Sequence, residues 1–211
     1  MIDPKKIDLP DFLVTWYGAP TTSATPLPDS CDWLPDPLKE WHTLTSRWEK
    51  RITFTTTMIP PERIKIAEDG KAIFMVDATG DWRWCIDPDD PDGVFDAERY
   101  EPWDRNPEQL TEFLVHNTVR EVVYGAAVRL RALAVPEETL TEILAPMEHV
   151  AFGAWEWPAP GYRIHMGGAV LAETVKAESG PGWDVEVVTS EFHRVAHLER
   201  MTEVHWRRQA A

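Results

Sequence analysis

The stretch ERIKIAEDGKAIFMVDATGDWRWCIDPDDPDGVF, residues 62–95, decides the fold of the first half of this chain. Two short polar runs that end in Gly70 and Gly80 divide it, and such runs are typical of hairpin turns. The stretch therefore predicts three antiparallel strands, at residues 63–67, 71–77 and 81–87. In the third strand Trp82, Trp84 and Ile86 alternate with polar residues, so we expect them to share one face of the sheet.

The run DPDDPDG, residues 87–93, follows these strands and holds two prolines and a glycine. Because proline has no backbone N–H to donate to a strand ladder, we expect this acidic run to be a loop without regular structure.

Helical patterns flank the predicted strands. Apolar residues recur at helical spacing in residues 8–17 and again after Asp36-Pro37, as far as Trp48. Asn106 followed by Pro107 is typical of a helix N-terminus, so a further helix is predicted from there, continuing to Leu133 at its longest. The order α–α–β–β–β–α predicts an α+β domain, an antiparallel β-meander sheet packed with helices.

Val135-Pro136 marks a predicted boundary, which divides the chain into domains at residues 1–133 and 134–211. The second part predicts an α-β-β-β-β-α extension. Its elements are a helix at 136–144, strands near 149–156, 162–166, 168–177 and 183–189, and a final helix after Thr189-Ser190-Glu191. Whether these strands extend the first sheet or form a second one stays open at this point.

Charge restricts the function. The 211 residues include 36 acids and 21 bases, a net charge of −15. Nucleic acids and anionic membranes attract basic surfaces, so neither is an expected partner, and a basic protein fits best. Residues 68–104 alone hold 12 acids and three bases. This stretch is either a solvated loop that keeps the protein soluble or a surface that attracts a basic partner.

The two cysteines, Cys31 and Cys85, lie far apart and form no CxxC unit, which favours a reducing compartment. The first residues, MIDPKKIDLP, have no apolar run typical of a signal peptide, and no window is apolar enough to span a membrane. We therefore expect a cytoplasmic protein.

Neither catalytic residues nor a cofactor is predicted, because the chain has no GxSxG, GxGxxG or GxxxxGK motif. The aspartates near Gly93 do not fit an EF-hand, since Pro88 and Arg99 would occupy its first and twelfth positions. His193 and His197 have i, i+4 spacing, but Arg194 stands where a zincin needs glutamate, so no metal site is predicted.

Several segments together resemble the SUKH superfamily, which joins bacterial toxin-immunity proteins to fungal Smi/Knr-type regulators of cell-wall synthesis. They are LPDFLVTWYGAP at residues 9–20, the stretch 62–95, Trp103, and LTEFL at residues 110–114. The resemblance covers residues 9 to about 124. It departs from the family at Gly18-Ala19-Pro20, where paired glycines are common.

The resemblance implies a non-catalytic immunity protein that occludes a cognate toxin, often a nuclease, inside the producing cell. An acidic face would attract the basic toxin, and an aromatic residue would anchor it. The predicted partner-binding residues are Asp77, Asp81, Asp87, Asp89, Asp90, Asp92, Asp96 and Trp103.

Two alternatives stay open from the sequence. The chain has eleven tryptophans, and exposed ones among them would suit a domain that binds a carbohydrate or a peptide by stacking. A hydrolase that uses paired acids of the loop at residues 87–93 is the other, and it needs two carboxylates close together in a pocket.

Overall fold

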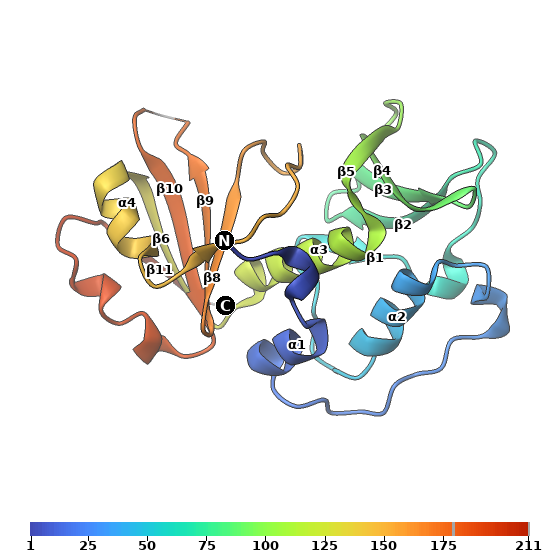
Figure 1. Ribbon diagram of the computed structural model, residues 1–211, viewed down its shortest axis with the longest axis horizontal. Helices are drawn as coiled ribbons and strands as arrows, with labels where there is room; N and C mark the ends of the chain where they lie inside the picture. Colours follow the sequence, from blue (N-terminus) through green and yellow to red (C-terminus); the bar gives the residue numbers. More distant parts are fainter. Residues whose placement is uncertain (179, 211) are drawn as a thin grey trace. The chain divides into compact units, whose positions relative to one another are not determined.

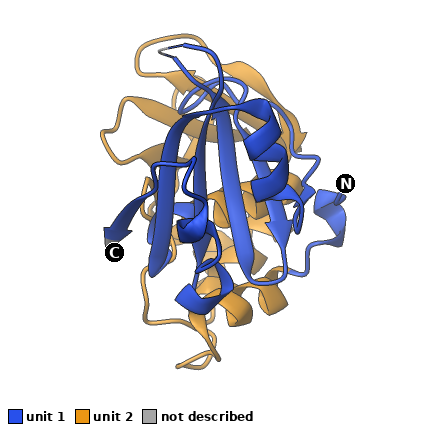
Figure 2. Cartoon of the chain, turned by 90° about the vertical axis from the view of Figure 1, so that its left-hand side faces the viewer, with its two compact units in different colours: residues 1–8, 122–211 blue, residues 9–121 orange. Residues whose placement is uncertain are grey.

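A computed structural model describes residues 1–178 and 180–210 of the chain. It is an α+β protein with two antiparallel sheets, which confirms the predicted class. The chain divides into two compact units, shown in Figure 2. Unit 1 consists of residues 1–8 and 122–211, and unit 2 of residues 9–121. The domain boundary predicted at residue 133 lies inside strand β6 (Val128–Val135) of unit 1.

Unit 2 contains a five-stranded meander in which each strand pairs with the next (Figure 1). Its strands are β1 (Thr56–Met58), β2 (Ala72–Asp77), β3 (Trp82–Asp87), β4 (Asp90–Glu98) and β5 (Asp104–Gln109). The turn from β2 to β3 forms because Gly80 has a φ of +78° and the Asp77 carboxylate accepts bonds from the Thr79 hydroxyl and the Trp82 N–H.

Two predictions for this sheet are wrong. Residues 63–67 are not a strand: they follow a 3-10 turn (Pro61–Arg63) and make one isolated bridge, from Ile66 to Ala72. The run at 87–93 is not an irregular loop, because β4 begins at Asp90. Pro91 lies near the start of β4, before the pairing with β5 begins at Gly93, and proline is tolerated there.

Gly93 lies against the side chain of Asp90. A Cβ atom there would lie 2.5 Å from a carboxylate oxygen of Asp90, at the flexible end of that side chain. A larger residue at position 93 would therefore require the Asp90 carboxylate, which is paired with Arg105, to move.

The helix predicted from Asn106 begins later. Residues 106–109 belong to β5, and helix α3 runs over Leu110–Gly125. Pro107 is tolerated because β5 is an edge strand, and the Asn106 side chain donates to Asp96 of the neighbouring strand. The helix also ends before Leu133, since the alternating residues 128–135 form a strand.

Two further helices complete unit 2, α1 (Leu9–Tyr17) and α2 (Asp36–Thr45). Trp48 lies beyond the end of α2 rather than on it, and it is held in a buried cluster with Leu13 while its indole N–H donates to the Gly18 carbonyl at 2.9 Å. The Trp41 indole of α2 donates to Thr118 of α3, also at 2.9 Å.

Unit 1 has a sheet of its own, which answers the question that the sequence left open. Its strand order is β11-β6-β10-β9-β8-β7. The further strands are β7 (Glu148–His149), β8 (Arg163–Gly167), β9 (Val170–Lys176), β10 (Trp183–Thr189) and β11 (Arg207–Ala210). Helix α4 (Glu137–Leu144) packs its Leu140 and Ile143 against this sheet.

The final helix predicted after Glu191 is wrong. The segment forms two 3-10 turns, Phe192–Arg194 and Leu198–Arg200, and the chain then continues into β11. Val195 and Leu198 are buried against the sheet at a spacing of three residues, so tertiary packing replaces a regular helix here. None of the helices in the described residues is long and apolar enough to cross a bilayer.

Candidate functional site

The structure does not bring the eight predicted binding residues together on one surface. Asp89 is exposed in the turn between β3 and β4 and Asp92 is exposed near the start of β4, whereas Asp81 is exposed at the opposite end of β3. Five residue steps of a strand separate these ends, about 17 Å. We call Asp89 and Asp92 the turn acids.

Four of the predicted aspartates are engaged inside the sheet. Asp77 is 8% exposed and serves the β2–β3 turn. Asp87 forms an ion pair with Lys71, and Asp90 forms one with Arg105. Asp96 accepts a hydrogen bond from the Asn106 amide at 2.6 Å. These carboxylates stabilise the meander, so the surface available to a partner is smaller than the sequence suggests.

The Lys71 ammonium and then the Asp89 N–H hold the pKa of the Asp87 carboxyl below its usual range, since both favour its charged form. Asp87 is therefore ionised at neutral pH and its charge is largely matched by Lys71.

Cations cover the aromatic residues on the outer face of this sheet. The Lys71 ammonium lies 4.3 Å from the centre of the Phe95 ring, and the Arg83 guanidinium lies 4.5 Å from that of Trp103. The Trp103 indole N–H also donates to Asp69 at 2.9 Å. Trp103, the predicted anchor, is thus half-buried and already bonded within the sheet.

A second acidic group surrounds the turn between β4 and β5. We call it the distal acids, namely Asp81, Glu98, Glu101 and Asp104, all of them exposed. In the described part of the chain, neither the turn acids nor the distal acids form an ion pair. Glu98, Glu101 and Asp104 belong to the acidic stretch at residues 68–104 but are not among the predicted binding residues.

Tyr100 lies at the tip of the same turn and is 83% exposed. Sequence reasoning missed it, because a single tyrosine between Arg99 and Glu101 carries no local signal of exposure.

The two cysteines and one histidine–glutamate pair are buried. Both cysteines are buried, and burial raises the pKa of the Cys85 thiol to about 12, which leaves no thiolate at neutral pH. The His116 Nδ1 lies 3.0 Å from a Glu108 carboxylate oxygen, but these side chains are only 1% and 3% exposed. This pair does not face solvent, so it belongs to the interior of unit 2.

The structure shows no metal site in residues 1–178 and 180–210. No three His, Cys, Asp or Glu side chains there lie close enough together to hold one ion. His193 lies in a 3-10 turn and His197 precedes the next one, so neither lies on the α-helix that their spacing would need.

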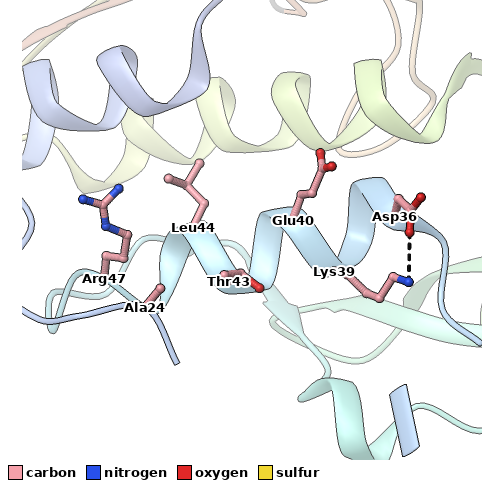
Figure 3. Close-up of a pocket in the computed structure, with 7 residues that line it drawn as sticks. All are labelled: Ala24, Asp36, Lys39, Glu40, Thr43, Leu44 and Arg47. Carbon is pink, nitrogen blue, oxygen red and sulfur yellow. Dashed lines mark ion pairs between the residues drawn. The ribbon is translucent and has the colours of Figure 1, made fainter. Parts of the chain in front are cut away.

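An open groove of about 550 Å³ runs along α2 (Figure 3). Two acids and two bases line it, and one pair of these, Asp36 and Lys39, forms an ion pair at 2.9 Å. Its charges balance, so it offers no preference for a charged ligand. Of the eleven tryptophans only Trp33 has an exposed side chain, at 39%, and it does not line this groove. A domain that binds a carbohydrate by stacking would therefore have one exposed tryptophan to use, Trp33.

Two half-buried histidines make stability depend on pH. Burial lowers the pKa of His42 to about 4, and burial with the charges of His149 and Arg163 lowers that of His165 to about 4. The unfolded chain, with histidine pKa near 6.5, takes up these protons first as pH falls. The free energy of unfolding should therefore decrease between about pH 6.5 and pH 4, by up to about 1.4 kcal/mol per pH unit for each histidine.

Urea unfolding measured across that range, for the wild type and for His42→Gln combined with His165→Gln, checks this prediction. The double variant should show a shallower decrease. The matched control, His193→Gln, replaces an exposed histidine and should keep the wild-type slope. Equal slopes for the double variant and the wild type would contradict the assignment.

A scan against protein-family models, a search of curated proteins and a search of solved structures each found no match to this chain.

Proposed function

We propose that this chain is a non-catalytic, SUKH-like immunity protein that binds a basic toxin domain through the acidic end surfaces of the unit 2 sheet. It acts in the cytoplasm of the producing cell, and its partner is a protein and not a nucleic acid or a membrane. The observation that carries the proposal is the set of exposed carboxylates without ion pairs in the described residues, the turn acids and the distal acids.

The distribution of bases supports this. Lys71 and Arg105 each neutralise an aspartate, and the Arg83 guanidinium lies over Trp103. The acids that remain at both ends of the meander form no ion pair with a base in the described residues. Their field raises the rate at which a positively charged protein encounters this surface.

The target class follows from the same chemistry. A nuclease binds the phosphates of its substrate with basic residues, and the exposed carboxylates at the ends of the meander offer those residues an alternative set of anions. A nuclease domain held in this way is occluded without any reaction on the immunity protein.

Charge reversal tests the proposal. The basic protein that co-purifies with the chain from its native cell is identified, purified and used as the binding partner. Asp89→Lys with Asp92→Lys, and separately Glu98→Lys with Glu101→Lys, should each lower its association rate about tenfold at low salt, because the steering field is weakened. Both variants should also show a flatter dependence of that rate on salt.

The matched control is Glu199→Lys with Glu203→Lys, two exposed acids of unit 1 that change the net charge by the same amount. This control should keep an association rate near that of the wild type. Unchanged rates in both sheet variants, or a co-purifying partner that is itself acidic, would refute the proposal.

A further inference from the structure

The turn between β4 and β5 has an unusual backbone. The Glu101 N–H donates to the Glu98 carbonyl at 3.0 Å, which closes a four-residue turn with Tyr100 in its third position. Tyr100 has a φ of +76°. A turn that needs positive φ at its third position favours glycine or asparagine, because a Cβ atom crowds the neighbouring carbonyl.

Glycines hold most such positions elsewhere. Among the described residues, seven glycines have positive φ, and the exceptions are Tyr100 and Ala134. At Gly70 and Gly80, in two other turns of unit 2, the strain is absent because no side chain is present. The β4–β5 turn thus has a bulky residue at a position where the backbone conformation favours glycine or asparagine.

The fold gains little from this tyrosine. Its side chain is 83% exposed, and its ring has one cation beside it, the Arg99 guanidinium at 4.9 Å, from a residue that is itself exposed. Backbone strain at a residue whose ring contacts only an exposed arginine points to a role outside the folded chain.

The surroundings identify that role. The distal acids flank the turn, and the backbone of Asp81 holds it through a bond from the Arg99 N–H. Tyrosine is enriched among the residues that dominate binding energy, since it offers a large contact area and has only two side-chain torsions to order. Trp103 is less suited, because Arg83 covers its ring and Asp69 binds its indole N–H.

We propose that Tyr100 is the anchor of the interface, inserting its ring into a pocket of the basic partner while the distal acids pair with the basic rim of that pocket. This rests on the proposed function and deepens it. Charge complementarity selects the occupant as a basic protein, since four exposed carboxylates belong to the β4–β5 turn and its flanks, against the single exposed cation beside the ring, Arg99.

Tyr100→Gly separates binding from folding. The variant relieves the positive φ, so its melting temperature should rise by about 2–4 °C. It should also dissociate from the co-purified basic partner about 10- to 100-fold faster, as expected for the loss of a dominant aromatic contact. Tyr100→Asn, which tolerates the same φ and keeps a side chain, should behave in the same way.

Tyr100→Phe keeps the ring and should stay within a few-fold of the wild-type dissociation rate. The matched control is Leu133→Ala, which trims an exposed apolar side chain of unit 1 and should leave the dissociation rate unchanged.

The outcomes distinguish the two proposals. Wild-type dissociation for Tyr100→Gly and Tyr100→Asn would overturn the role of Tyr100, while slower association of the Asp89 and Asp92 reversals would still support the proposed function. A lower melting temperature for both variants would show that Tyr100 serves the fold and would also overturn this inference.

Discussion

Replacing Glu121 with alanine is expected to lower the free energy of unfolding by about 3–5 kcal/mol, because several hydrogen bonds to one buried carboxyl group are lost together. Glu121 is fully buried on α3. Its carboxylate accepts bonds from the Thr55 and Thr56 N–H groups, both at 2.8 Å, from their hydroxyls at 2.7 and 2.8 Å, and from the Phe54 N–H.

These bonds connect the helix to β1 and to the segment before it. Alanine would leave five donors without their acceptor. The Thr56 N–H and hydroxyl among them are buried, and water does not reach these two without opening the structure. The edge strand of the meander should then loosen first.

Urea unfolding of the purified variant measures this effect. Glu138→Ala, which removes an exposed acid from α4, is the control and should change stability by less than about 0.5 kcal/mol. A loss below about 1 kcal/mol for Glu121→Ala would contradict the role given to this carboxylate.

Phe113→Ala is expected to cost about 3–5 kcal/mol, since it removes a large ring from a close-packed core. Phe113 is fully buried, and its ring meets Phe74 edge-on at 5.7 Å and Trp84 at 6.2 Å. These contacts attach α3 to the inner face of the meander that bears the acidic surface.

The near-UV circular dichroism signal of the tryptophans and a urea titration measure the outcome. Phe113→Leu keeps most of the volume and should cost less than half as much. Val14→Ala, at an exposed apolar position of α1, should be close to neutral. A two-state curve for Phe113→Ala that overlays the wild type would show that this ring does not organise the core.

The predictions that succeeded depend on local signals. Strands β2 and β3 lie within a residue of where the glycine turns and the alternation placed them, because a hairpin turn acts on its own neighbours. Helix α1 follows in the same way from its apolar spacing and the break at Gly18.

The predictions that failed depend on partners distant in sequence. Asn106-Pro107 has the local pattern of a helix start, yet pairing with β4 makes it a strand. The segment 128–135 continues the apolar pattern of α3, yet it becomes the strand between β10 and β11. In both cases hydrogen bonding to neighbouring strands outweighs the local preference for a helix.

The same distinction between local and long-range signals applies to the candidate site. A count of charged residues located the acidic stretch, but ion pairs between strands decided which carboxylates stay exposed. Lys71 reaches Asp87 across 16 positions of the chain, and Arg105 reaches Asp90 across 15. The positive φ of Tyr100 depends on how the β4–β5 turn closes. The turn has no glycine or asparagine at this position from which the sequence could predict it.

By itself the amino-acid sequence determined the α+β fold class, the strong negative charge and the hairpins that turn at glycines. Composition and short-range sterics depend only on the residues themselves and their neighbours in the chain. Tertiary structure alone decided that there are two sheets, which acids are neutralised and which aromatic ring points outward. Those outcomes arise from contacts between strands, whose energies exist only once the chain has folded.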